Sequence, residues 1–572
     1  MIYKISSLKP HTRFIEVETV IETHLLDTII LKLPNWRPGR YELGNFAKNI
    51  QSFKVVTPDV GNLVKFEKTD KSTWKIYCKD LEHIKVSYNY YSNQLDGGGC
   101  FTSEDQLYFN PVQCCMYIPE QMKTEHTIQL IIPQDWKIAT GMRVDGQRLI
   151  AKDYDELADC PVIASPTLQH KQYESGGVSF HIWIQGDYQP DWNTLIKDFK
   201  SFSDLQIKVM QEFPAKDYHF LIQILPTEFY HGVEHLNSTV LALGPGDKLN
   251  ERKNYIELLG VASHELYHSW NVKTIRPEAM MPYNYEKENY SRSGYIYEGF
   301  TTYFGDLFLK RCGVFTQEEF FTEVEKRINK HLNNYGRFNM SVADSSFDTW
   351  LDGYTAGVPN RKVSIYDEGS LIGMAIDLTA LNFTKGKMRL ETAMLALYQD
   401  FGKNNIGYRD NDARFTLEAI AGTSLTDVFE NYVYKNASYF DLLVETLGYA
   451  GCTLEASDSE KTFETFYGFK IVATDTLTKI IAVAPDSPAD VALLSVGDEI
   501  ISAYGEPVKN NLSDLIQQHA TDELTLEINS SFKKKHIVVK RTDKKFYPHY
   551  KIAVSAKMTK EQKFVFEKWL LG

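Results

Sequence analysis

The periodicity of apolar residues changes partway along this chain of 572 residues. Up to about residue 170, short segments alternate apolar and polar residues or are rich in β-branched residues, and turn signals such as Gly97-Gly98-Gly99 separate them. From there to about residue 450, apolar residues recur mostly at helical spacing. The pattern therefore predicts a β-rich domain followed by a mainly helical one.

The expected elements define four regions. The strands predicted in the first region are Phe14–Thr23, Thr28–Leu33, Ser52–Val56, Thr73–Cys78, Ile84–Tyr91, His126–Ile132 and Arg148–Lys152. The second region has predicted strands Val178–Gln185 and His219–Leu225, and predicted helices Trp192–Phe213, Tyr255–Trp270, Gly299–Cys312, Thr316–Asn333, Gly369–Asn382 and Lys387–Tyr398. Short strands return near residue 453, and Thr559–Leu571 has helical spacing. We expect a multidomain α+β protein: a β-sandwich over 1–172, a mainly helical domain over 173–452, a small β domain over 453–545 and a helical tail over 546–572.

Charge and composition exclude several classes of protein. A net charge of −13 argues against nucleic acid as the main partner. No run approaches 18 apolar residues, so we expect no membrane span, and Met1–Ser6 does not begin a secretory signal. Seven scattered cysteines favour a reducing, cytoplasmic setting, although a trimmed secreted or periplasmic protein would look the same. The oligomeric state stays open.

The motif His264-Glu265-Leu266-Tyr267-His268 lies within the predicted helix Tyr255–Trp270. Residues four apart share a helix face, so His264 and His268 can direct both imidazoles at one metal ion. Glu265 stands beside the first ligand, where it could take a proton from an attacking water. Such a motif arises by chance in roughly a few per cent of sequences of this kind. A catalytic zinc site usually needs a third protein ligand as well.

Glu298 is the best candidate for that third ligand. It stands at the start of a predicted helix, where its carboxylate could face the first helix and complete a His2Glu site. A solvated glutamate at a helix N-terminus, favoured by the macrodipole, is the alternative. Spacing alone does not decide between them, because many acidic residues follow His268.

The stretch from His264 to Pro277, together with Tyr297–Thr301, resembles the glycyl aminopeptidase family of gluzincin zinc metallopeptidases. The 29 residues between His268 and Glu298 suit this family, since the related aminopeptidase N group places its glutamate closer. The resemblance implies a thermolysin-like catalytic domain with one zinc ion per chain. The roles that it implies are general base for Glu265 and zinc ligands for His264, His268 and Glu298.

Three further segments resemble the same family. Trp36–Tyr41 is similar to a signature of its N-terminal β domain. The stretch with Gly232 and Glu234 is similar to an edge strand that holds the substrate, which implies that Glu234 pairs with a free α-ammonium. Tyr366 corresponds to the catalytic tyrosine, a donor to the developing oxyanion. Glu368 stands where the family usually has lysine, a departure that weakens this last match; without the resemblance, Tyr366 would be interpreted as a core residue.

The small β domain resembles a PDZ domain of the bacterial protease-associated type. The resemblance rests on Asp486–Ala489 and on Gly497–Ile501, where Gly497-Asp498 suits a tight turn before a strand. Phe466–Phe469 is similar to the loop that captures a peptide carboxylate through backbone N–H groups. Such modules bind peptide C-termini or brace a catalytic domain, and the sequence leaves both open.

These observations predict a zinc aminopeptidase that acts on peptides with a free N-terminus and, by resemblance, prefers small first residues such as Gly or Ala. Two alternatives remain at this point. One is a zinc endopeptidase with the same site. The other is a peptide-binding scaffold led by the PDZ domain, which the intact set of site residues speaks against.

Overall fold

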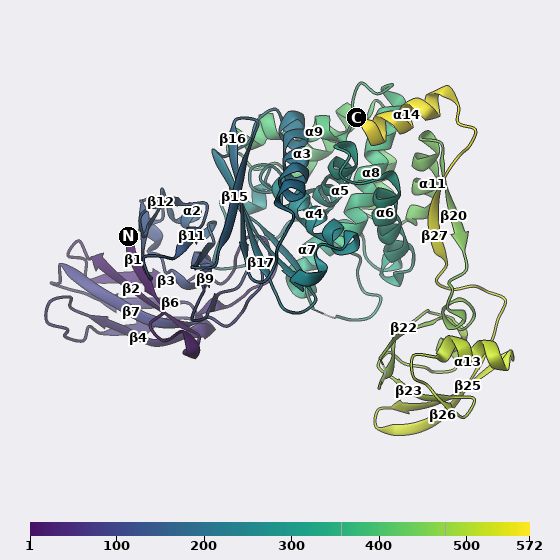
Figure 1. Cartoon of the computed structure of the whole chain (residues 1–572), viewed down its shortest axis with the longest axis horizontal. Helices are drawn as coiled ribbons and strands as arrows, with labels where there is room; N and C mark the ends of the chain where they lie inside the picture. Colours follow the sequence, from purple (N-terminus) through teal and green to yellow (C-terminus); the bar gives the residue numbers. More distant parts are fainter. Residues whose placement is uncertain (356, 475) are drawn as a thin grey trace.

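The computed structural model describes residues 1–355, 357–474 and 476–572. Figure 1 shows a β-rich part at the N-terminal end, a helical part in the middle and a smaller β module that hangs below the C-terminal side. The architecture is therefore α+β with several parts, as the sequence predicts. No helix in the described part of the chain is long and apolar enough to cross a membrane.

Strands packed around one apolar core form the N-terminal part. Its largest sheet has the order β12 (Arg143–Asp145), β13 (Arg148–Ala151), β10 (His126–Ile131), β1 (Ile2–Ser6), β2 (Phe14–Glu22), β7 (His83–Tyr91) and β4 (Ile50–Val56). A second sheet joins β3 (Thr28–Lys32), β6 (Thr73–Tyr77) and β5 (Phe66–Lys68), and a third joins β11 (Lys137–Ala139), β14 (Val162–Ser165), β9 (Leu107–Phe109) and β8 (Phe101–Thr102). Alternate residues of β2 and β7 are buried, which explains why alternation predicts them.

A five-stranded mixed sheet begins the second part. Its order is β15 (Gln169–Ser175), β16 (Val178–Gln185), β17 (Asp217–Ile224), β19 (Ser238–Gly244) and β18 (Phe229–Glu234), and β18 runs antiparallel at the edge. The helices α3 (Trp192–Met210) and α4 (Arg252–Tyr267) follow strands of this sheet, and α4 packs on β18 and β19. The sequence pattern predicts neither β18 nor β19. β19 shows no alternation because it is buried along nearly all its length.

Helices complete this part. The expected ones are α5 (Thr301–Arg311), α6 (Gln317–Leu332), α8 (Ile365–Phe383) and α9 (Leu390–Leu397), while α7 (Val342–Asp352), α10 (Asp410–Ala421) and α11 (Tyr439–Tyr449) were not predicted. A π-helical turn, η6 (Tyr295–Phe300), leads into α5. The central helix α8 is buried along most of its length and packs against η6, α5 and α6.

The C-terminal module is carried on a two-stranded stalk. β20 (Cys452–Ser457) pairs antiparallel with β27 (His549–Val554). Between them lies a sheet with its own apolar core, in the order β21 (Phe469–Ala473), β22 (Thr478–Val483), β23 (Glu499–Ala503), β25 (Glu523–Ser530) and β26 (Lys533–Lys540), with helices α12 (Pro488–Val491) and α13 (Leu512–His519). The last helix, α14 (Lys560–Leu571), is the expected C-terminal helix and returns to the helical part (Figure 1).

Candidate active site

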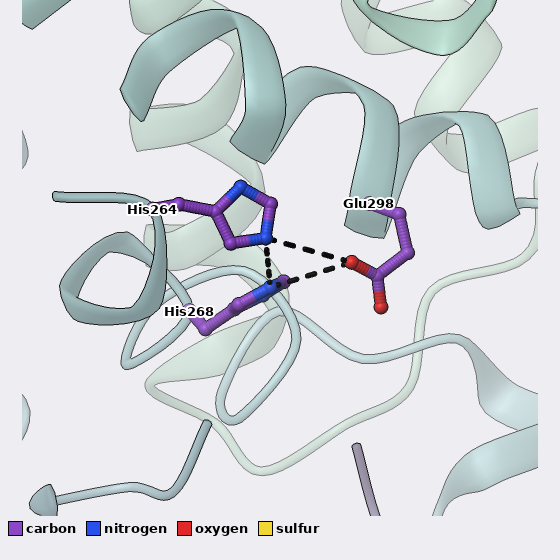
Figure 2. Close-up of side chains that lie close together, drawn as sticks. All are labelled: His264, His268 and Glu298. Atoms are coloured by element: carbon purple, nitrogen blue, oxygen red, sulfur yellow. Dashed lines mark hydrogen bonds and ion pairs between the residues drawn. The ribbon is translucent and has the colours of Figure 1, made fainter. Parts of the chain in front are cut away.

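His264 of α4, His268 directly after that helix, and Glu298 of η6 converge, as Figure 2 shows. The Nε2 atoms of His264 and His268 lie 2.9 Å apart. Oε2 of Glu298 lies 3.8 Å from Nε2 of His264 and 3.4 Å from Nε2 of His268. Ligands bound at about 2.0–2.1 Å to one tetrahedral ion lie about 3.3 Å from one another. The three side chains therefore have the spacing of a shared metal site.

The local structure fixes the orientation of these ligands. Nδ1 of His268 lies 2.6 Å from the backbone carbonyl oxygen of Asn271, which leaves Nε2 to face the site. The side-chain amide of Asn271 donates to the carbonyl oxygen of Ile296 at 2.9 Å and to the hydroxyl of Thr301 at 3.0 Å. Asn271 thus ties the end of α4 to the turn that carries Glu298.

The N-terminal domain also reaches the site. The hydroxyl of Tyr41 donates a 2.5 Å hydrogen bond to Oε1 of Glu298, so that the other carboxylate oxygen faces the histidines. Tyr41 is buried, and its ring packs against those of Tyr297 and Trp350. The sequence of Trp36–Tyr41 resembles a family signature but indicates no role for Tyr41, because a contact between domains leaves no signal in local spacing.

Glu265 lies beside the ligands as a buried carboxyl group. Its Oε2 atom has no hydrogen-bond partner among the described residues. Burial, together with the nearby Glu234 carboxylate, raises the pKa of Glu265 well above its usual value against the opposing effect of His268. A Cβ at Gly232 of β18 would lie 2.2 Å from Oε1 of Glu265. Glycine at this position leaves room for the carboxyl group of Glu265.

Glu234 is the last residue of β18 and lines the same cavity as the two histidines and Glu298. The side chain is buried, and Oε1 has no partner in the described part of the chain. Gly39 closes the hollow behind it, since a Cβ there would lie 2.6 Å from Oε2 of Glu234. Carboxylate oxygens of Glu234 and Glu265 and a ring nitrogen of His268 all lie within 4.8 Å of one another. An unpaired, buried carboxylate is costly unless a cation joins it.

Tyr366, near the start of α8, lines the same hollow. Burial, reinforced by the Glu298 carboxylate, raises the pKa of its phenol well above the usual value, so the hydroxyl keeps its proton and can donate it. The glycines of η6 and α8 allow these two elements to pack closely, because a Cβ at Gly299 would lie 2.3 Å from Cα of Gly369. Glu368 points elsewhere and forms a buried 2.8 Å contact with Nδ1 of His331, which explains an acid at this position.

One hollow of about 500 Å³ collects these side chains. The predicted site residues that line it are Gly232, Glu234, His264, Glu265, His268, Glu298 and Tyr366. The sequence thus predicts the members of the site, and their roles stay predictions.

Two stretches of the sequence match models of one peptidase family. Residues 2–166 match the Peptidase M61 N-terminal domain, and residues 257–372 match M61 glycyl aminopeptidase. The expected resemblance is therefore confirmed for these two stretches, which include the metal-site segment. The matches and the fold together identify a peptidase.

Two solved structures are similar to this chain to very different degrees. The crystal structure of an aminopeptidase N family protein from Idiomarina loihiensis is similar over the whole length, with a TM-score of 0.92 and 26% identity over 100% of this chain and 99% of that one. An M1 zinc metallopeptidase from Deinococcus radiodurans aligns with a TM-score of 0.46 and 12% identity over 76% of this chain and 93% of that one, a similarity too distant to inform the site. A comparison with curated proteins gives no match.

Proposed function

We propose that this protein is a zinc-dependent aminopeptidase, most active on peptides that begin with a small residue. The observation that carries the proposal is the convergence of three ligand atoms with two unpaired, buried carboxylates, Glu265 and Glu234, in one hollow. The name of the matched glycyl aminopeptidase model supports the preference for a small residue.

The donor set fits zinc. Two imidazole nitrogens and one carboxylate oxygen are a ligand set of catalytic zinc sites, which keep a fourth position open. When bound, one zinc ion would polarise the scissile carbonyl and lower the pKa of the attacking water. The residues that would hold it are His264, His268 and Glu298.

The remaining residues divide the work of peptide hydrolysis. Glu265 would accept the proton of the attacking water and pass it to the departing amine. The phenol of Tyr366 would donate a hydrogen bond to the carbonyl oxygen as negative charge develops there. Glu234 would pair with the α-ammonium of the substrate, which only a chain end carries, and so place the first peptide bond at the site.

The C-terminal module supports the PDZ resemblance in its order of elements. The loop that resembles a carboxylate-binding loop, Phe466–Phe469, leads into β21, which lies at an open sheet edge, and α13 lies between β23 and β25 in the chain. An extended peptide could add to such an edge strand. We propose a PDZ-type module on this basis. Separately, we propose on the basis of the scattered cysteines that the protein belongs to the cytoplasm.

The proposed function is tested with alanyl-anilide and an N-acetylated alanyl peptide. We expect one zinc per chain by metal analysis and much faster turnover of the substrate with the free amine than of the acetylated peptide. A zinc-loaded, folded protein that cleaves the acetylated peptide equally well is an endopeptidase instead. A protein that binds peptides but cleaves neither substrate would be the scaffold.

Metal binding is expected to release a proton. Burial lowers the pKa of His268, but Glu298 outweighs burial and raises it to about 10, while the imidazoles lower the pKa of Glu298 to about 2. At neutral pH the metal-free His268 therefore carries a proton that zinc must displace. Affinity for zinc should rise about tenfold per pH unit from neutrality and level off near pH 10. Calorimetry in buffers of different ionisation enthalpy checks this; zinc binding at pH 7 without proton release contradicts it.

Replacing Tyr41 by Phe should weaken zinc binding about tenfold, because Glu298 loses the hydrogen bond that orients it. Competition with a chelator measures the affinity. Tyr297→Phe is the matched control, since that buried hydroxyl has no partner among the described residues. Equal zinc affinities for the two variants would refute a positioning role for Tyr41.

A further inference from the structure

Helix α6 borders two hollows. Its residues Lys326 and Lys330 line the active-site hollow and also a second one, of about 400 Å³, between α6 and the C-terminal module. We call the second the outer hollow; its walls include Asn329 of α6 together with Lys470 and Tyr547 of the module. Because the two hollows share these wall residues, they adjoin each other across α6.

Three lysine side chains, Lys326, Lys330 and Lys470, line the outer hollow and bring positive charge to it. Lys326 and Lys330 keep side-chain exposures of 56% and 68%, and the Lys330 ammonium lies 3.6 Å from its nearest carboxylate, on Asp367. Lys470 forms no ion pair within the described ranges, and its ammonium lies 4.5 Å from the ring centre of Tyr547. A partly buried ammonium without a carboxylate partner is suited to an incoming anion.

The acids of the outer hollow are already engaged. Oε1 of Glu325 accepts from the backbone N–H of Ile552 at 2.8 Å. Glu464 accepts from the hydroxyl of Ser459 at 2.9 Å and lies 3.4 Å from the ammonium of Lys461. Lys326 is also engaged, by Glu323 at 2.6 Å, so Lys330 and Lys470 are the groups that a ligand would meet.

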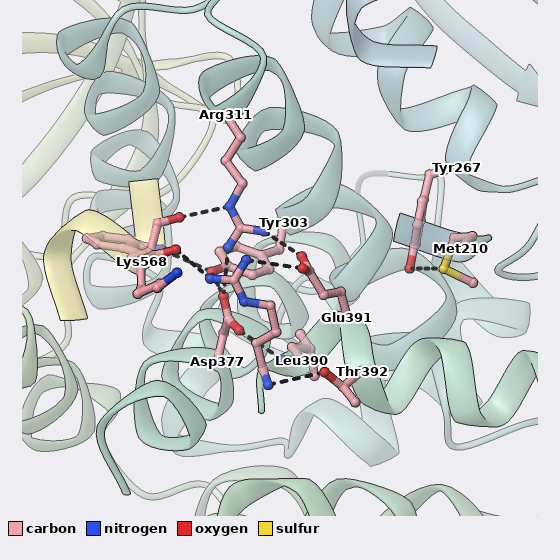
Figure 3. Close-up of polar contacts among 11 residues, drawn as sticks. Met210, Tyr267, Tyr303, Arg311, Asp377, Leu390, Glu391, Thr392 and Lys568 are labelled. Atoms are coloured by element: carbon pink, nitrogen blue, oxygen red, sulfur yellow. Dashed lines mark hydrogen bonds and ion pairs between the residues drawn. The ribbon is translucent and has the colours of Figure 1, made fainter. Parts of the chain in front are cut away.

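The module is held in place beside α6. Asn329 exchanges two 2.8 Å hydrogen bonds with the backbone of Tyr550 in the stalk. Beyond the stalk, α14 docks on the helical part, where the carbonyl oxygen of Trp569 accepts from Arg311 at 2.9 Å and Lys568 accepts through its carbonyl oxygen from Arg389 at 2.5 Å (Figure 3). Both anchors follow the module in the chain and hold its stalk and the last helix against the helical part.

The two hollows lie side by side at the same level of α6. Glu323, Lys326, Arg327 and Lys330 line the active-site hollow, and Thr322, Glu325, Lys326, Asn329, Lys330 and Asn333 line the outer one. A substrate that extends from the active site past Lys326 and Lys330 therefore reaches the outer hollow.

We infer that the outer hollow binds a carboxylate on the part of the substrate that follows the cleaved bond. The inference rests on the proposed aminopeptidase function and specifies its substrates: short peptides that end in, or carry near their end, a negative charge. Lys470 of the module and Lys330 of α6 would receive that charge.

Binding is measured by calorimetry in the Glu265→Gln variant, which cannot turn the ligand over. The probes are Ala-Ala-Gly-Ser-Gly-Asp as the free acid, the same peptide as its C-terminal amide, and the amide ending in Asn. We expect the free acid to bind about tenfold more tightly than the amide ending in Asn. If the affinity falls when the free acid is replaced by its C-terminal amide, the bound group is the terminal carboxylate. If it falls when Asp in the amide is replaced by Asn, the bound group is the side chain.

Lys470→Gln and Lys330→Gln should each weaken binding of the free acid about fivefold and leave the amide ending in Asn unaffected. Lys540→Gln, on the exposed face of β26, is the matched control and should change nothing. Equal binding of all three probes, or the same affinity in the Lys470→Gln variant, overturns the inference. Because binding is read without turnover, failure of alanyl-anilide hydrolysis would count against the proposed function alone.

Discussion

Glu265→Gln is expected to lower kcat for alanyl-anilide about a thousandfold while the protein retains one zinc per chain. The amide keeps the size of the side chain but cannot accept a proton, and general-base catalysis contributes about 10²–10⁴-fold. Steady-state kinetics and metal analysis on the same sample separate loss of the base from loss of the metal.

The matched control for this prediction is Glu257→Gln. Glu257 belongs to the same helix and lines the same hollow, but it is exposed and is not assigned a role. We expect the activity of the Glu257→Gln variant to stay within about twofold of the wild type, as for most surface substitutions. A Glu265→Gln enzyme with more than a tenth of wild-type activity would refute the assigned base.

Glu234→Gln should lower kcat/KM for peptides with a free N-terminus about a hundredfold. Removing one partner of a buried charge pair costs about 2–5 kcal/mol, and the amide offers no charge to the substrate ammonium. N-acetylated peptides lack that ammonium, so their slow cleavage should not fall. The measured quantity is the ratio of kcat/KM for the free and acetylated forms of one peptide.

Glu228→Gln serves as the control for Glu234, because it lies just before the same strand and its side chain is 87% exposed. In the Glu228→Gln variant, the ratio of kcat/KM for the free and acetylated peptides should equal that of the wild type. If Glu234→Gln lowers both substrates equally, the carboxylate supports the site generally and does not select a chain end.

Local pattern was enough for part of the fold and part of the site. The 3.6-residue period places His264 and His268 on one face of α4, and their Nε2 atoms indeed meet. Alternation likewise predicts β2 and β7, each with one buried face. Where a strand is buried on both faces, as β19 is, the pattern disappears and the strand was missed.

Contacts between distant segments required more than local pattern. Glu298 is one of many acids downstream of α4, and only resemblance to a family selected it. The hydrogen bond from Tyr41 crosses 257 residues of sequence and two domains, and the pairing of Glu368 with His331 depends on how α8 meets α6. Such pairings follow from tertiary packing, which no short window of sequence contains.

The central claim is a zinc ion shared by His264, His268 and Glu298. An anomalous difference map from crystals grown with zinc, recorded above and below the zinc absorption edge, tests it directly. We predict one strong peak at about 2.0–2.2 Å from Nε2 of both histidines and from a carboxylate oxygen of Glu298. A map without density among these three side chains, or with the zinc peak elsewhere in the chain, would contradict the account.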